Sequence, residues 1–295
     1  MSAPQDPDQD FSISIEEIPE RLDEQHDITT RVLGFLIHPN IPITSPTLKV
    51  ADVGCGTGIW LLDVAKTLPP TCQLVGYDKS ASALPPAQGL PPNVTFHVHD
   101  MLHPFPESEL GTYDVVAVRF VSSASTRAEW ARAARNLATL LRPGGWLQWI
   151  DSCNFSLYCS SPGTPRAACA EIYAGLAPFR ASDDLVIGLF MREPPAIDGG
   201  GVGREEVLRG LGLADVQEDV FSTDRLRDGG LDLRARSTRN IMDCFVSCLE
   251  ELVGVEGSGW DKERIARLRT EVWREIDAGV YHTLDHVCLV GRKAG

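Results

Sequence analysis

A glycine cluster after a short apolar run holds the residues with the clearest chemical use in this 295-residue chain. The run at 48–53 passes through Asp52 and is followed by Gly54-Cys55-Gly56-Thr57-Gly58. Glycines let a backbone turn sharply and approach a ligand without a Cβ clash, and a following helix offers unpaired N–H groups. The pattern predicts a cofactor site between a strand and a helix, and it suits dinucleotides and other adenosine-containing cofactors alike.

The spacing of the glycines separates these cofactors. A dinucleotide fingerprint reads G-x-G-x-x-G, and Ile59 occupies its third glycine position here, which disfavours a dehydrogenase. Residues 50–58, Val-Ala-Asp-Val-Gly-Cys-Gly-Thr-Gly, instead resemble motif I of the class I S-adenosylmethionine-dependent methyltransferases, an acidic residue followed by x-G-x-G-x-G. S-adenosylmethionine carries an ammonium and a sulfonium and no pyrophosphate, so the carboxylate of Asp52 suits this cofactor.

Further features match the same family at the expected places. Asp78 ends the second apolar run, where the resemblance implies a carboxylate that accepts both ribose hydroxyls. Asp100-Met101 follows the third run, where the family contacts the adenine, and residues 140–147 resemble its L-x-P-G-G turn. The resemblance implies S-adenosylmethionine as cofactor, S-adenosylhomocysteine as product and these cofactor-binding residues: Asp52, Gly54, Cys55, Gly56, Thr57, Gly58, Asp78, Lys79, Asp100, Met101, Arg119 and Phe120.

A closer resemblance extends beyond these motifs. Residues 21–26, 36–42, 52–60 and 93–100 are similar to fungal small-molecule methyltransferases of secondary-metabolite pathways. This resemblance implies methyl transfer to an O, N or S atom of a small molecule, and it names no substrate. Two alternatives remain open: a regulator of the same fold that acts through protein partners, and a cofactor-bound enzyme that does not methylate, such as a cyclase.

Residues for substrate contact and proton transfer are less clearly marked. Arg119 follows the fourth apolar run, at the sheet edge where ligands bind, and a surface ion pair is its alternative. The substrate candidates are Gln25, His26, Trp60, Asp151 and Tyr173, each of which has capping, surface or core packing as an alternative. His26 and His282 are weak candidates for a general base, and the catalytic residue is unknown.

A group of histidines invites a metal interpretation, which the pattern does not favour. His97 and His99 alternate with Phe96 and Val98, so they share one face of the expected strand at 93–99. That strand lies at the sheet edge in the family's strand order, where a half-polar face is expected. We therefore expect no metal site, because three-histidine sites are uncommon and no second-shell pattern accompanies these residues.

Apolar runs alternate with helical patterns through the first half of the chain. Strands are expected at 48–53, 72–77, 93–99, 113–120 and 145–151, and helices at 19–37, 59–68 and 125–141. Alternation of this kind predicts a parallel sheet covered on both faces. The fold class is therefore α/β, a Rossmann-like, mostly parallel seven-stranded sheet with helices on both faces and an added helical cap.

The second half of the chain is less regular. Helices are expected at about 163–177, 182–192, 204–211, 237–253 and 261–278, and strands at 214–221 and 284–290. The predicted organisation is a disordered acidic tail at 1–17, an N-terminal cap helix within 18–46 and a methyltransferase core at 47–295. Helical cap insertions are expected at about 152–202 and 237–280.

The charge of the chain bears on its partners. The formal net charge is −14, and no run of Lys and Arg is present that could replace counterions on a phosphate backbone. We therefore expect a small-molecule substrate and neither nucleic acid nor membrane as partner. No apolar run is long enough for a membrane span, and no secretory signal is evident, so a cytoplasmic monomer or homodimer is expected.

Overall fold

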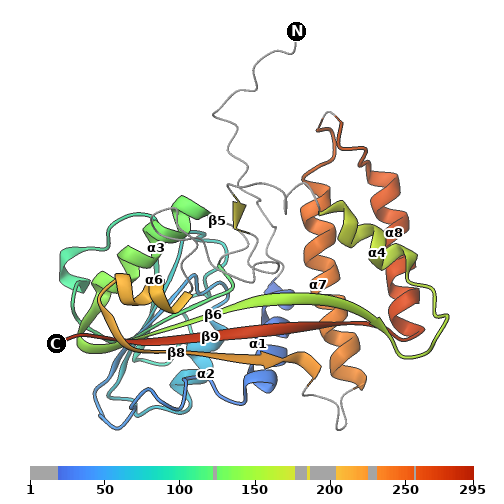
Figure 1. Ribbon diagram of the computed structural model, residues 1–295. Helices are drawn as coiled ribbons and strands as arrows, with labels where there is room; N and C mark the ends of the chain where they lie inside the picture. The colour runs from blue at the N-terminus through green and yellow to red at the C-terminus, as the bar shows by residue number, and fades with distance from the viewer. Residues whose placement is uncertain (1–18, 122–124, 177–184, 187–203, 225–230, 256) are drawn as a thin grey trace.

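A single seven-stranded sheet organises the chain. The computed structural model describes residues 19–121, 125–176, 185–186, 204–224, 231–255 and 257–295 (Figure 1). The strand order is β3-β2-β1-β4-β6-β9-β8, and only β9 runs antiparallel to its neighbours β6 and β8. The strands are β1 (Lys49–Val53), β2 (Gln73–Asp78), β3 (Val94–Val98), β4 (Tyr113–Arg119), β6 (Leu141–Cys159), β8 (Leu213–Ser222) and β9 (Val280–Lys293). The predicted mostly parallel α/β sheet is confirmed.

Alternate residues of the strands feed two separate cores, one on each face of the sheet. On one face Val53, Val116 and Trp149 pack with helices α3 (Arg127–Leu140) and α6 (Arg204–Gly210). On the other face Val50 and Ile150 pack with α1 (Pro19–Leu33) and α2 (Ile59–Ala65). This is the two-sided burial that makes parallel strands apolar throughout. A short 3₁₀ helix, η1 (Glu107–Glu109), precedes β4.

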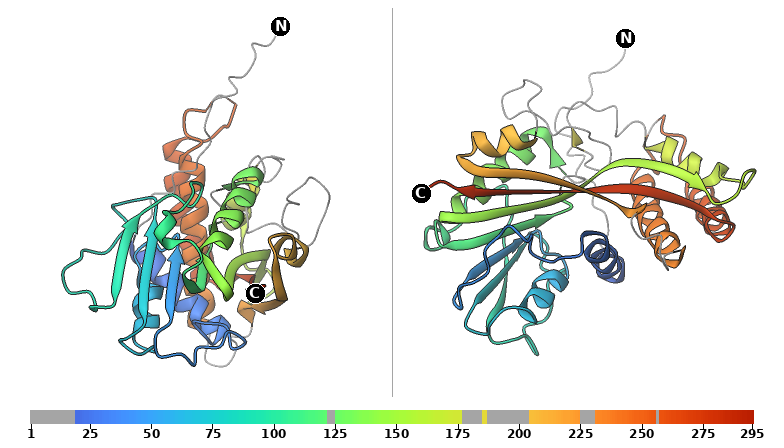
Figure 2. Two further views of the ribbon diagram at one scale, coloured as in Figure 1. Left: turned by 90° about the vertical axis from the view of Figure 1, so that its left-hand side faces the viewer. Right: turned by 60° about the horizontal axis from the view of Figure 1, so that its bottom comes forward.

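A third apolar cluster forms beside the sheet. Helices α4 (Ala167–Gly175), α7 (Leu231–Glu250) and α8 (Lys262–Asp277) pack together against the parts of β6 and β9 that continue past the other strands. Figure 2 shows these two strands as a long ribbon that joins the sheet to the three helices. Both strands are longer than predicted, since 145–151 and 284–290 cover only their central parts.

Some predicted elements end elsewhere. The helix expected at 19–37 stops at Leu33, because Gly34 adopts a left-handed φ of 81° and its N–H closes the last turn on Thr30. The helix expected at 182–192 is wrong where it can be checked: Leu185–Val186 is strand β7, paired with β5 (Ser125–Thr126). The rest of that helix, like the tail at 1–17, lies outside the described residues.

Candidate cofactor site

The glycine loop is bound directly to the end of the neighbouring strand. Val53 pairs with Tyr77 in the parallel register of β1 and β2, and the Tyr77 carbonyl then accepts the N–H groups of Gly54 (2.8 Å) and Cys55 (3.0 Å). One residue further, the Gly56 N–H donates to Oδ2 of Asp78 at 2.8 Å. The loop and Asp78, matched separately in the sequence, therefore form one unit at the carboxyl edge of the sheet.

The loop needs its glycines for backbone reasons as well as for space. Gly54, Gly56 and Gly58 have φ values of 70°, 52° and 73°, in the left-handed region that side chains disfavour. A Cβ on Gly58 would lie 2.5 Å from Cζ of Phe96 on β3. A substituted side chain at 58 would thus meet an aromatic ring as well as backbone strain.

Asp52 places an unpartnered carboxylate next to this loop. The residue is fully buried, and neither carboxylate oxygen has a hydrogen-bond partner among the described residues. Burial raises the pKa of Asp52 to about 6, against the opposing effect of the Arg119 charge and with a further contribution from Asp78. Buried charges are normally paired, so this carboxylate is suited to a cationic ligand group.

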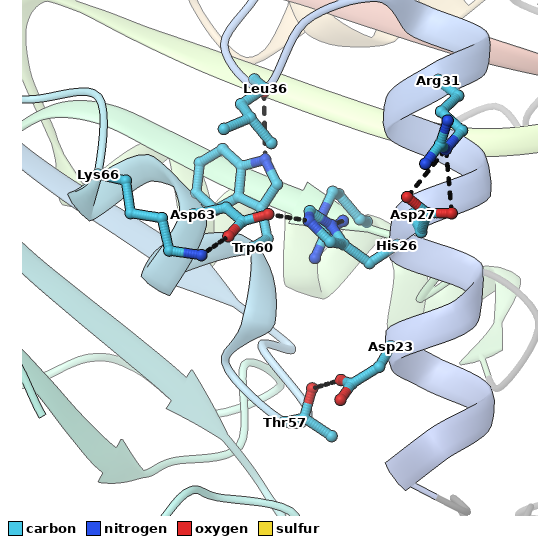
Figure 3. A network of polar contacts seen from close by, with 10 residues as sticks. Asp23, His26, Asp27, Arg31, Leu36, Thr57, Trp60, Asp63 and Lys66 are labelled. Atoms are coloured by element: carbon cyan, nitrogen blue, oxygen red, sulfur yellow. Dashed lines mark hydrogen bonds and ion pairs between the residues drawn. The ribbon is translucent and has the colours of Figure 1, made fainter. Parts of the chain in front are cut away.

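Arg119 ends β4 and belongs to a chain of polar contacts that sequence reasoning did not foresee. Its Nη1 donates to Nδ1 of His26 on α1 at 3.2 Å, and His26 Nε2 lies 3.0 Å from Oδ2 of Asp63 on α2. The guanidinium also lies over the Trp60 ring, 5.5 Å from its centroid. Figure 3 shows His26 reaching from α1 toward Asp63, which also binds Lys66.

Helix α1 lies over the glycine loop. The Thr57 hydroxyl donates to Asp23 of α1 at 2.7 Å, as Figure 3 shows, and Leu22 lies against the loop at Gly56. Gln25, on the same helix, is half-buried and accepts a 3.4 Å bond from Arg21. Helix α1 therefore covers the glycine loop. Of the two predicted substrate residues on this helix, Gln25 and His26, His26 contacts Arg119.

The other predicted cofactor residues lie around the ends of β2, β3 and β4. Asp78 Oδ1 accepts the Ser80 N–H at 2.9 Å, while Lys79 beside it is exposed. After β3, the Met101 carbonyl accepts a bond from Asn136, and Asp100 accepts the Leu102 N–H. These contacts fix the two loops that the resemblance assigns to the ribose and the adenine.

Phe120 connects the end of β4 to an additional buried histidine. It has a left-handed φ of 55°, and its ring meets that of His286 edge-on at 5.4 Å between centroids. His286 lies 3.1 Å from the Ser152 hydroxyl, on the paired strand β6. Burial lowers the pKa of His286 to about 4. Sequence reasoning missed His286 and Ser152, because neither belongs to a recognisable motif.

The remaining substrate candidates do not gather at one point. Trp60 is almost completely buried and donates its indole N–H to the Leu36 carbonyl, so it is a packing residue beneath Arg119. Asp151 lies on β6, next to Ile150, the residue paired with Arg119. Tyr173 lies on α4, stacked on Phe155 at 4.8 Å, within the third apolar cluster.

The two histidines proposed as bases are both buried and hydrogen-bonded to protein groups. His282 is buried among the hydroxyls of Ser237 and Thr238, and burial, aided by His286, lowers its pKa to about 3. His26 has both ring nitrogens in contact with protein groups, and burial followed by the Arg119 charge lowers its pKa. Both imidazoles are therefore less basic than a free histidine, because burial disfavours their charged forms.

Among the described residues, no three His, Cys, Asp or Glu side chains lie together as a metal site would require. None of the described helices is long and apolar enough to span a membrane.

Part of the chain is similar to known methyltransferases. Residues 50–145 match the family described as methyltransferase domain. N-methyltransferase sirN of Leptosphaeria maculans is 40% identical over 131 residues, and methyltransferase grgD of Penicillium is 38% identical over 137. These alignments cover 44% of this chain and only 45% and 48% of the relatives, so the chain spans about half the length of each. Methyltransferase pytC of Aspergillus terreus is 28% identical over 93% of this chain and 80% of its own length.

A solved structure supports the fold over a greater length. The phosphoethanolamine N-methyltransferase 2 of Haemonchus contortus, in complex with phosphomonomethylethanolamine and S-adenosylhomocysteine, superposes with a TM-score of 0.52. The superposition covers 99% of this chain and 62% of that one at 15% identity, a level that bears on the fold alone. Over residues 50–145 the chain is thus similar to methyltransferase domains, and the solved structure shares its fold.

Proposed function

We propose that this protein transfers a methyl group from S-adenosylmethionine to a nitrogen atom of a small secondary metabolite. The observation that carries the proposal is the buried Asp52 carboxylate, unpartnered among the described residues and adjacent to a loop of three left-handed glycines. A dinucleotide brings two phosphates to such a loop, and a buried carboxylate beside them would repel its charge. A cofactor with a cationic amino-acid end gains from the same carboxylate.

The residues present fit S-adenosylmethionine at both of its ends. Asp78, at the end of β2, would accept the ribose hydroxyls, and the loops at Asp100 and Met101 would enclose the adenine. At the other end Asp52 would hold the ammonium, while Arg119 offers a guanidinium of opposite charge for the carboxylate. When bound, the cofactor supplies a methyl group made electrophilic by the neighbouring sulfonium.

The choice of nitrogen rests on the chemistry of the protein's own groups and on its relatives. Burial lowers the pKa of both His26 and His282, and protein groups already contact their ring nitrogens, which disfavours either ring as the base that removes a proton from a hydroxyl. A neutral amine or ring nitrogen attacks through its own lone pair and needs no such base. The relative sirN is named as an N-methyltransferase, which agrees with this choice.

A small acceptor is favoured over a macromolecule. The net charge of −14 opposes binding to nucleic acid. Helices α4, α7 and α8 form an apolar cluster beside the carboxyl edge of the sheet, and we assign them to a cap that encloses the acceptor. Phe120, His286 and Ser152 lie where β4, β6 and β9 adjoin, and we place the acceptor near them.

Calorimetric titration with S-adenosylhomocysteine tests the cofactor assignment. Micromolar binding is expected for the wild type and a loss of at least tenfold for Asp78→Ala, with no heat from NAD as a control. Methyl-labelled S-adenosylmethionine with an extract of amines then tests the reaction, and the label should pass to the product. With unlabelled cofactor the product should gain 14 mass units, one CH2. Cofactor binding without any methylated product would instead favour the regulatory or non-methylating alternatives.

A further inference from the structure

We propose that His26 is a positioning residue, which holds the Arg119 guanidinium toward the carboxylate of the cofactor by linking it to Asp63. The proposal rests on the proposed function, because it assigns a ligand group to Arg119. It also replaces the earlier roles of His26 as base or substrate contact. The three residues come from three elements, β4, α1 and α2, so the link forms only when α1 lies over the site.

The contacts fix one protonation state of His26. Arg119 has only N–H donors, so the 3.2 Å contact between its Nη1 and His26 Nδ1 requires a bare Nδ1 lone pair. The proton of the neutral ring is then on Nε2 and donates to Asp63 Oδ2 at 3.0 Å. Although burial alone would raise it, the bonds from Lys66 and His26 lower the pKa of Asp63 and keep it an acceptor. The imidazole is therefore a neutral spacer between an anion and a cation.

A spacer has a consequence that a direct ion pair would not have. Asp63 bound directly to Arg119 would occupy two guanidinium donors in a bidentate pair. Through His26, one contact of Nη1 is used, while the Arg119 Nε is buried without a partner among the described residues. The guanidinium also lies over the Trp60 ring, a cation–π contact that uses none of its N–H donors. The remaining donors stay available for a ligand carboxylate.

The charged groups around His26 make this arrangement sensitive to pH. The charged groups that act on its pKa are Asp63 on α2, Arg119 on β4 and Asp23 on α1 itself. Lys66, just after α2, binds Asp63, and Arg119 also interacts electrostatically with Asp52 of β1. A proton added at Nδ1 would meet an Arg119 donor and a positive charge. Protonation therefore breaks the link to Arg119, and the closed arrangement is favoured only while His26 is neutral.

A ligand that lacks the amino-acid end separates positioning from general structural damage. S-adenosylhomocysteine carries the carboxylate, and 5′-methylthioadenosine has the same adenosine and sulfur without it. We expect His26→Ala to weaken binding of S-adenosylhomocysteine about tenfold or more, and binding of 5′-methylthioadenosine less than twofold. His26→Asn offers Arg119 an amide oxygen near the place of Nδ1, and part of the affinity should return. Arg31→Ala, on the exposed side of α1, is the matched control and should bind both ligands like the wild type.

The pH profile gives an independent readout. Because the His26 pKa is lowered in the closed form, affinity for S-adenosylhomocysteine should fall as pH drops through that lowered pKa, by up to tenfold per unit. Asp52, with a pKa of about 6, titrates in the same range, so Asp52→Asn is measured in parallel. The His26→Asn profile should be flatter than that of the wild type, and the Asp52→Asn profile should retain the His26 component.

The outcomes separate this proposal from the proposed function. Suppose that the wild type binds S-adenosylhomocysteine and that His26→Ala weakens binding of S-adenosylhomocysteine and 5′-methylthioadenosine equally, or weakens binding of neither. The positioning role is then wrong and the proposed function stands. Equal pH profiles for wild type and His26→Asn also contradict it. No binding by the wild type overturns the proposed function and the role of His26 together.

Discussion

Asp52 shows a conflict between stability and ligand binding at the scale of one residue. Its pKa is raised from 3.8 to about 6 by burial, so the folded protein holds the charged form at a cost of about 3 kcal/mol at most. The sign follows from the direction: the folded state binds the extra proton between these two pKa values, so the cost is present above pH 6 and disappears toward pH 4. We therefore predict that Asp52→Asn is more stable to urea at pH 7.5, by about 1–3 kcal/mol, and that the gain shrinks below pH 6.

The same variant should lose affinity for S-adenosylhomocysteine, because the ammonium no longer meets a carboxylate. Asp215→Asn is a suitable control, since Asp215 is exposed, pairs with Arg292 and should change stability by less than about 0.5 kcal/mol. A uniform destabilisation of Asp52→Asn from pH 5 to 8 would contradict the assignment of a buried, unpartnered charge.

A site residue could be predicted from the sequence when it lies within a motif or at the end of a predicted strand. Asp52 and Gly54 to Gly58 lie in one motif, and Asp78 could be placed because it ends the next strand. Asp63 belongs to no motif, and its partner His26 lies 37 residues away in sequence, so their contact appears only when α1 and α2 are packed. Their roles remain proposals, since spacing predicts position at a strand end and not the partners of a side chain.

At the scale of elements, α4 depends on an acidic residue of another helix. Both carboxylate oxygens of Glu275 on α8 accept N–H groups of the first turn of α4, those of Ala168 and Cys169, each at 2.9 Å. The N-cap residue of α4, Arg166, makes no side-chain cap bond, so this carboxylate satisfies donors at the helix N-terminus and interacts favourably with the helix dipole. We predict that Glu275→Ala lowers the free energy of unfolding by about 2–3 kcal/mol, measured in urea.

A graded set of variants tests this interpretation. Glu275→Gln retains one acceptor oxygen and should lose about half as much stability as the alanine variant. Glu271→Gln, one turn earlier on α8, removes an exposed pair with Arg267 and should change stability by less than about 0.5 kcal/mol. Equal effects at positions 271 and 275 would argue against a capping role for Glu275.

The lengths of the strands were predicted less well than their existence. The end of β6 was missed, although Phe155, Leu157 and Cys159 pack inward while Ser156 and Tyr158 are exposed. This alternation is the signal of a strand with one buried face, but polar neighbours and the following proline-rich segment obscured it. Its burial comes from α4, α7 and α8, which are distant in sequence, so the strand is stabilised by contacts that a local window does not include.

At the scale of the whole molecule, α1 joins the two sides of the site, as Figure 1 shows. On the sheet side it is held by Asp23 to Thr57 and by His26 to Asp63. On the side of α7, Arg236 binds Glu24 at 2.5 and 2.6 Å and Asp27 at 2.9 Å, and Asn240 donates to the Arg21 carbonyl. The position of α1 over the loop therefore depends on α7 as much as on the sheet.

Removal of the α7 contacts should loosen α1 without unfolding the sheet. We predict that Arg236→Ala speeds hydrogen exchange of the α1 amides several-fold and weakens S-adenosylhomocysteine binding, because α1 must be ordered again when the ligand binds. High salt should reproduce part of the effect in the wild type, since these side chains are only partly buried. Arg239→Ala is the matched control: Arg239 is also on α7 but pairs with Asp277 of α8, so α1 exchange should not change. If saturating ligand slows α1 exchange in Arg236→Ala back to the wild-type rate, closure of α1 and cofactor binding are one coupled equilibrium. If neither the variants nor the ligand change α1 exchange, α1 is held by its apolar face alone.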